Sequence, residues 1–233
     1  TPTLAIGELP VHPEMAREFA AALGKAPCRY LPAAVTSSGR TLSVIADGVS
    51  FYAKVAYQRL LGRVTRKMTM AHVLSAIEVS AMYESAIKTG RMPPSFHIYR
   101  ERCGLYFSGE ALLKDWGYVE RDLAPFPAER TFIAVPSFSL IATPRDGEPP
   151  LIMELLDATP ALRMADGFFA HFIQPLIDLY FSSVIVLGLQ PEAHAQNIVF
   201  LLNEDHVPFG IALRDMESVD KDLPLIEARG LAN

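Results

Sequence analysis

The stretch PEAHAQNIVFLLNEDHVPFGIALRDMES, residues 191–218, organises the rest of the chain. Two apolar, β-rich runs in it flank a turn-prone segment at 203–208, a pattern typical of a β-hairpin with a longer loop. Antiparallel pairing places the residues before the first strand beside those after the second. We therefore expect Asn197 and Asp215 to converge at the open end of this hairpin. The other polar residues expected at that end are Glu192, His194, Gln196 and Arg214.

Carboxylate and amide side chains at the open end of the hairpin indicate a cation site. Mg²⁺ takes few protein ligands, prefers oxygen atoms, and completes its shell with water and phosphate. The sequence therefore predicts a magnesium site formed by Glu192, Asn197 and Asp215. The alternative interpretation is a hairpin whose polar ends only face solvent.

Composition excludes some classes of protein. The chain has 233 residues, 50% of them hydrophobic, and a mean hydropathy of +0.21. This length can bury a sizeable core in a single domain, with any subdivision expected near 90–130. So apolar a composition predicts that part of the surface packs on the remainder of a longer chain. A net charge of −5 and a pI near 5.7 argue against nucleic-acid binding.

The cellular setting is expected to be the cytoplasm. Cys28 and Cys103 lack the spacing of a metal site, and a reducing compartment is the default for so few cysteines. No signal-peptide pattern is present. The longest apolar stretch, 176–189, is short and contains Asp178, so we expect no membrane span.

Runs of helical and strand-like pattern alternate irregularly along the chain. This mixture predicts an α+β fold with an antiparallel sheet and flanking helices. Expected helices cover 14–23, 56–88, 151–158 and 166–186. Expected strands outside the hairpin cover 29–35, 42–46, 51–57, 97–99, 105–107 and 131–143, and 112–127 is expected to be a connection.

Three upstream features could supply positive charge to phosphates at the hairpin. The glycine-containing turn at 37–41 could direct backbone N–H groups and hydroxyls at phosphate oxygens, although a plain turn is the alternative. Lys54 lies on an expected strand and could equally face solvent. Arg66, with Arg63, lies on an expected helix, where a guanidinium could bind carboxylate or phosphate or be merely solvated. The magnesium site predicted at the hairpin independently requires phosphate ligands. This requirement favours the interpretation of these three features as phosphate-binding residues.

Taken in order, these segments resemble the synthetases that make siderophores without a nonribosomal peptide synthetase, the aerobactin-synthetase-like or IucA/IucC family. The most specific element is Glu-x-His-x-Gln-Asn at 192–197 with the downstream pair Arg214-Asp215. The supporting segments are Leu-Pro-Val-His-Pro at 9–13, Ser-Gly-Arg-Thr at 38–41, Lys54 and Arg66.

The resemblance implies residue roles and a reaction. It implies that ATP adenylates citrate or a citrate-like acid with loss of pyrophosphate, and that an amine or hydroxyl then displaces AMP. Mg²⁺ would be held by Glu192, Asn197 and Asp215. ATP phosphates and the substrate carboxylate would be bound by Ser38, Arg40, Thr41, Lys54 and Arg66. His194 and Gln196 would line the substrate and the nucleotide, and the catalytic roles would fall to Lys54, Arg66 and His194.

The resemblance also implies an architecture. Residues 1–233 would form the palm-type, nucleotide-binding part of a larger hand-shaped enzyme, whose antiparallel sheet carries the nucleotide site. The expected partners are a small polycarboxylate and an amine or hydroxyl substrate, with neither nucleic acid nor membrane. A homodimer is compatible with this expectation.

Several positions depart from the family pattern. The upstream His-Pro-x-His segment is absent, and Gly62 stands where a hydroxyl residue is usual. Glu14-Met15 replaces Trp-Gln, and Met216-Glu217 replaces Phe-Gly. Two alternatives therefore stay open: a kinase-like phosphotransferase using Mg²⁺–ATP, and a degenerate domain without catalysis. Against the kinase, the segment just before Asn197 lacks an aspartate to act as a base, since position 192 is Glu and position 194 is His.

Overall fold

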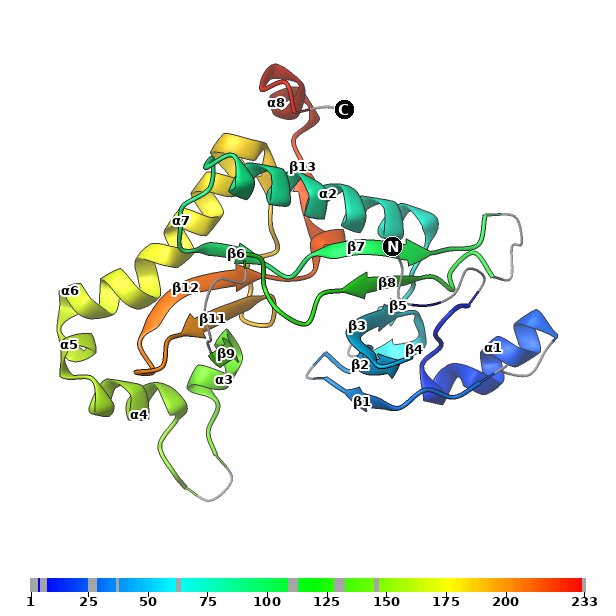
Figure 1. The fold of residues 1–233 in the computed structure, drawn as a ribbon, viewed down its shortest axis with the longest axis horizontal. Coiled ribbons are helices and arrows are strands. Elements are labelled where there is room, and N and C mark those ends of the chain that lie inside the picture. Colours follow the sequence, from blue (N-terminus) through cyan, green and yellow to red (C-terminus); the bar gives the residue numbers. More distant parts are fainter. Residues whose placement is uncertain are drawn as a thin grey trace. The chain divides into compact units, whose positions relative to one another are not determined.

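The computed structural model describes residues 4, 8–24, 29–36, 38–61, 64–108, 113–127, 133–144 and 147–231. The chain divides into two compact units (Figure 1). The first unit comprises Thr1–Ser80 and Arg100–Leu123, and the second comprises Ala81–Tyr99 and Ala124–Asn233. The first unit is therefore built from two separate pieces of sequence.

The first unit contains a five-stranded antiparallel sheet with the order β1-β2-β3-β8-β7. Asp47 and Gly48 connect β2 to β3 with φ angles of 50° and 80°, as a tight two-residue hairpin turn requires. The strands are β1 (Ala33–Val35), β2 (Thr41–Ala46), β3 (Val49–Val55), β7 (Glu101–Leu105) and β8 (Tyr118–Arg121). A separate ladder joins β4 (Tyr57–Leu61) to β5 (Val64–Arg66).

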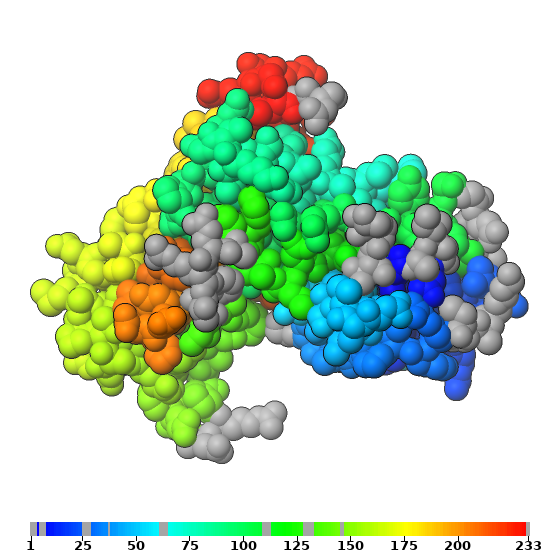
Figure 2. Space-filling view, in the orientation of Figure 1, coloured from blue at the N-terminus to red at the C-terminus, as the bar shows by residue number. Residues whose placement is uncertain are grey.

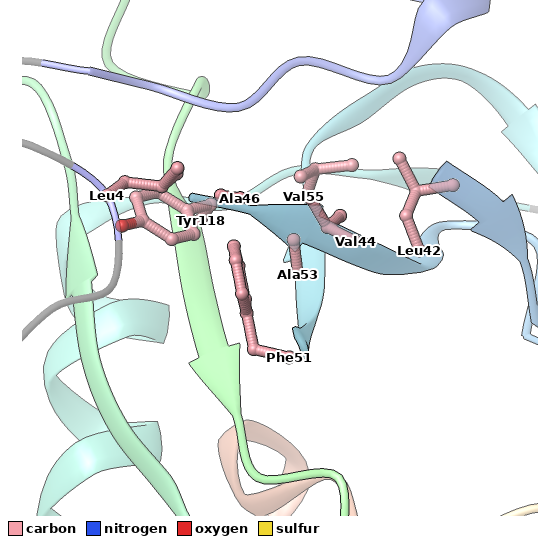
Figure 3. Close-up of a cluster of buried hydrophobic side chains, with 8 residues drawn as sticks. All are labelled: Leu4, Leu42, Val44, Ala46, Phe51, Ala53, Val55 and Tyr118. Atoms are coloured by element: carbon pink, nitrogen blue, oxygen red, sulfur yellow. The ribbon is translucent and has the colours of Figure 1, made fainter. Parts of the chain in front are cut away.

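One face of this sheet packs a hydrophobic core (Figure 3). Alternate residues of a strand point to opposite faces, so every second residue of β2 and β3 contributes to that core. The buried cluster consists of Leu4, Leu42, Val44, Ala46, Phe51, Ala53, Val55 and Tyr118. The intervening residues of β3, including Lys54, must therefore lie on the opposite face.

A short helical segment precedes the sheet. The 3-10 turn η1 (Pro13–Met15) leads into helix α1 (Ala16–Leu23), which ends at Gly24 with a left-handed φ of 70°. Glycine is favoured in this position because it has no Cβ to strain the left-handed backbone. The helix expected at 14–23 is confirmed.

The second unit contains a four-stranded sheet with the order β6-β12-β11-β9. Strand β6 (Phe96–Ile98) runs parallel to β12 (Pro208–Leu213), whereas β11 (Ile198–Leu202) is antiparallel to both β12 and β9 (Ile133–Pro136). Every residue of β11 is buried, so the strand is covered on both faces. The expected hairpin is confirmed.

Helices pack against this second sheet. A continuous helical stretch at 165–187 packs on β12 and β6. That stretch consists of α6 (Ala165–Phe168), η2 (Phe169–Ile173), α7 (Gln174–Ser182) and η3 (Ser183–Leu187). The remaining elements are α2 (Met70–Lys88), which spans the boundary at residue 80, α3 (Ser137–Ile141), α4 (Leu151–Ala158), α5 (Pro160–Arg163), β10 (Leu189–Gln190), η4 (Met216–Ser218), β13 (Asp220–Lys221) and α8 (Leu223–Ala228).

The helical stretch at 165–187 is long and apolar enough to cross a membrane by length and composition alone. Its inward face is a core face, since Phe172, Leu179 and Leu187 are buried. Core helices of proteins without membrane spans pass the same test of length and composition. The expectation of no membrane partner therefore stays a prediction.

Some sequence expectations are wrong. The helix expected at 56–88 begins only at Met70, because Tyr57–Leu61 and Val64–Arg66 pair as the β4–β5 ladder. Arg66 consequently lies on a strand. Residues 112–127, expected to be a connection, include strand β8, and the strand expected at 131–143 gives way to α3 at Ser137. The α+β class and helix α4 are confirmed, whereas the division into domains stays a prediction.

Candidate functional site

The open end of the β11–β12 hairpin lies where the sequence places it. Ile198 pairs with Leu213, so the residues next to them come together. The backbone N–H of Arg214 donates to the carbonyl of Asn197 at 3.0 Å, and its Nε donates to the carbonyl of Gln196 at 2.8 Å. These two bonds hold the segment before β11 against the residues that follow β12.

Asn197 is fixed by its own side chain. It is buried, with 3% of its surface exposed, and its amide nitrogen donates to the carbonyl of Glu192 at 3.2 Å. Because the amide nitrogen of Asn197 donates this bond, its amide oxygen points away from the Glu192 carbonyl. The amide oxygen is the atom that a hard cation would bind.

Asp215 follows β12 in a strained backbone conformation. Its φ and ψ are 78° and 62°, in the left-handed region, and its side chain does not cap the turn that follows. A non-glycine residue there costs on the order of 1 kcal/mol. Such strain persists where the surrounding structure requires it, and it is concentrated at functional sites.

Glu192 and His194 form an exposed pair. The Nε2 atom of His194 lies 3.6 Å from a carboxylate oxygen of Glu192, and both side chains are about half exposed. The Nδ1 atom of His194 accepts the backbone N–H of Gln196 at 3.2 Å. In a neutral imidazole the proton is then on Nε2, facing Glu192.

The turn at 38–41 in the first unit is closed by its own hydrogen bonds. Ser38 N–H donates to the Thr36 hydroxyl at 3.4 Å, and Gly39 N–H donates to the Thr36 carbonyl at 3.1 Å. Arg40 N–H donates to the Ser38 carbonyl at 2.9 Å, and Thr41 N–H donates to the Ser38 hydroxyl at 3.2 Å. All four N–H groups are used inside the turn, so the expectation that they point at phosphate is wrong. Among residues 38–41, side chains must provide any phosphate contact, and Ser37 lies outside the described residues.

Lys54 and the turn are neighbours. Thr41 on β2 pairs directly with Lys54 on β3, and Val55 N–H donates to the carbonyl of Arg40 at 3.2 Å. Lys54 is 1% exposed and Arg40 is 6% exposed. The interpretation of Lys54 as a solvent-facing strand residue is therefore wrong. Burying an ammonium group costs several kcal/mol unless anions or dipoles compensate it.

Arg66 lies on the separate β4–β5 ladder. It pairs with Tyr57 across that ladder and is exposed. Tyr57 donates a 2.5 Å hydrogen bond from its hydroxyl to Glu14, and its ring meets that of His12 edge to face. Sequence reasoning did not assign Tyr57 to the site, because its partners lie more than forty positions away in the chain.

The predicted site residues therefore form two groups. Arg40, Lys54 and Arg66, with Ser38 and Thr41, belong to the first unit, and the hairpin residues belong to the second. Their convergence on one ligand remains a prediction. Over the ranges that the structure describes, no three His, Cys, Asp or Glu side chains group as a metal site. The expected magnesium site is not of this type, because one of its three ligands, Asn197, is an asparagine.

Solved structures share this arrangement of strands and helices. The petrobactin biosynthesis protein AsbB from Bacillus anthracis aligns with a TM-score of 0.77 at 20% identity, over 97% of this chain and 40% of that chain. The fold is that of siderophore synthetases. ATP-bound aerobactin synthetase IucA from Klebsiella pneumoniae aligns with a TM-score of 0.70 at 17% identity, over 95% of this chain and 44% of that chain.

A third structure belongs to the same group. Aerobactin synthetase IucC from Klebsiella pneumoniae aligns with a TM-score of 0.69 at 16% identity, over 94% of this chain and 42% of that chain. The resemblance stated from the sequence motifs is thus confirmed at the level of fold. The chain spans about two fifths of the length of these structures.

Sequence comparisons add one partial match. The family model described as "Ferric iron reductase FhuF-like transporter" matches residues 165–232, which hold the helical stretch and the hairpin. The search of curated protein sequences gave no significant match.

Proposed function

We propose that this chain is the ATP-binding part of a ligase in siderophore biosynthesis, which activates a carboxylic acid by adenylation. The observation that carries the proposal is the match of nearly the whole chain to siderophore synthetases, one of them bound to ATP. The motif residues support it, since both the open end of the hairpin and the turn beside Lys54 are built from them.

In the proposed reaction a carboxylate oxygen of citrate or a citrate-like acid attacks the α-phosphorus of ATP, and pyrophosphate leaves. An amine or hydroxyl of the second substrate then attacks the acyl carbon, loses its proton, and displaces AMP. Neither step needs an enzyme nucleophile. Catalysis would come from orientation and from charge stabilisation in a preorganised site.

We assign roles to the residues on this basis. Mg²⁺, held by Glu192, Asn197 and Asp215, would neutralise phosphate charge. Arg40, Lys54 and Arg66 would bind the phosphates and the acid, since unpaired anions in a partly buried site are costly. His194 would hold the acid near the α-phosphate. Ser38, Thr41 and Gln196 would complete the nucleotide site. The cytoplasm remains the proposed compartment.

The test is an assay of the full-length protein with ATP, Mg²⁺, citrate or 2-oxoglutarate, and a polyamine or hydroxamate amine. We expect formation of AMP and pyrophosphate that depends on the acid and falls in Asn197→Ala. Asp205→Asn is the matched control, because Asp205 lies in the exposed loop at the far end of the hairpin, orange in Figure 2. ADP with a phosphorylated acceptor would contradict the proposal.

A further inference from the structure

His12, in the Leu-Pro-Val-His-Pro segment, is one of the most buried polar residues of the first unit. It is 4% exposed and caps η1, its Nδ1 atom accepting the backbone N–H of Glu14 at 3.2 Å. Because Nδ1 is the acceptor, a neutral ring carries its proton on Nε2. Burial lowers the pKa of His12, although the nearby Glu14 carboxylate and the Gly39 backbone act in the opposite direction. The ring is therefore neutral at pH 7.

The His12 ring contacts the strand pair that carries Arg66. Its centroid lies 5.0 Å from that of Tyr57, with the planes at 85°, an edge-to-face arrangement that is favourable for aromatic rings. Tyr57 donates to Glu14 at 2.5 Å, and Tyr57 pairs across the ladder with Arg66. The three residues His12, Glu14 and Tyr57 thus form a cluster, and its member Tyr57 is the strand partner of Arg66.

The other ring nitrogen of His12 is a candidate donor to the turn at 38–41. Its Nε2 atom is buried and has no hydrogen-bond partner of good geometry within the described ranges. The backbone of Gly39, in the turn at 38–41, raises the pKa of the His12 ring, as a hydrogen-bond acceptor beside it would. A buried donor without an acceptor destabilises the folded protein, whereas an aromatic hydrocarbon ring would fill this space without that cost. A small approach of Gly39 would satisfy the donor.

We propose that His12 is a positioning residue for nucleotide binding: its Nε2–H bonds the Gly39 backbone when ATP is held, while its ring fixes Tyr57 and hence Arg66. This inference rests on the proposed function. The N–H groups of the turn at 38–41 are already used inside the turn. A bond from His12 to Gly39 would hold the turn in place and so position the Arg40 side chain. His12 is also linked, through its contact with Tyr57, to the strand pair that carries Arg66.

Three variants of the full-length protein separate the two nitrogens. His12→Asn keeps an acceptor near Nδ1 and loses Nε2, whereas His12→Gln keeps a donor near Nε2. His12→Phe keeps the ring against Tyr57 and loses both polar atoms. We expect the Kd for ATP, measured by calorimetry, to rise about tenfold in His12→Asn and His12→Phe and to recover at least partly in His12→Gln. His206→Asn, in the exposed hairpin loop, is the control and should bind ATP as the wild type does.

Nitrogen-15 NMR of wild-type His12 makes the test independent of variant folding. We expect ATP to slow solvent exchange of the Nε2 proton and to shift its resonance. Unchanged exchange, or wild-type ATP affinity in both His12→Asn and His12→Phe, would overturn the inference and leave the proposed function standing. A wild-type protein that binds no ATP would overturn both.

Discussion

Thr41 and Lys54 lie directly opposite each other on the neighbouring antiparallel strands β2 and β3. Residues paired in this way share one face of the sheet, and the Figure 3 core occupies the other face. The turn at 38–41 and the buried lysine are therefore one structural unit, although thirteen positions separate the pair in the sequence.

Lys54→Met should abolish most nucleotide turnover while the protein stays folded. Methionine fills similar volume, but a preorganised cation is lost, and such losses cost about 10²-fold or more in rate. Pyrophosphate release by the full-length protein measures the effect, and the melting temperature monitors folding. Lys88→Met is the control, since Lys88 is exposed and pairs only with Glu84 on the same helix among the ion pairs of the described residues. Equal rates in both variants would remove Lys54 from the site.

Arg66→Ala should lower acid-dependent pyrophosphate release by roughly 10²-fold, by analogy with other lost charge-stabilising donors. Arg66 is exposed on β5, so the variant should keep wild-type stability. Arg59→Ala is a matched control on the partner strand, because Arg59 is exposed and bound to Glu18. Release that is unchanged in Arg66→Ala would show that this residue is only a surface charge.

Arg121→Met should destabilise the protein by about 3–5 kcal/mol, because it leaves the Glu101 carboxylate buried without its cation. The two side chains are 5% and 0% exposed and lie 2.5 Å apart. Adding Glu101→Gln removes the uncompensated charge and should restore much of the loss. Urea denaturation of the single and double variants measures this difference. A double variant less stable than Arg121→Met would contradict the prediction.

Cys103 should resist alkylation in the folded protein. Burial and the neighbouring Glu120 raise the pKa of its thiol to about 11, from an ordinary value of 9.0. Because only the thiolate reacts, two pKa units correspond to roughly 10²-fold slower reaction at pH 8. Mass spectrometry of the Cys103 peptide after iodoacetamide treatment, with and without urea, gives the ratio. Comparable rates in both conditions would show that the thiol is not shielded.

Local chemistry accounts for what the sequence predicted correctly. The β11–β12 hairpin, the stop at Gly24 and the turn at Asp47-Gly48 all follow from turn residues next to apolar runs. These signals lie within a few residues of the structures they define. The same locality made the open end of the hairpin, with Asn197 and Arg214 together, predictable.

Long-range packing accounts for what the sequence could not predict. Basic residues at 59, 63 and 66 have helical spacing, yet 57–61 and 64–66 form strands, since strand propensity depends on packing partners more than on local preference. Strand β8 exists because β3 and β7 pair on either side of it. The burial of Lys54 likewise depends on the assembled sheet, and the contact of His12 with Tyr57 joins residues far apart in the chain.

The first unit is built from two separate pieces of sequence, and this affects how it folds during synthesis on the ribosome. Strand β8 lies between β3 and β7, and it is translated only after residues 81–99, which separate the two pieces of the unit and include β6. A nascent chain that ends before Tyr118 therefore exposes the hydrogen-bonding edge of β3, and unpaired edges promote aggregation. The parallel partner of β6 is made later still, at Pro208–Leu213. Slow passage through residues 60–120 should thus increase the demand of this protein for chaperones.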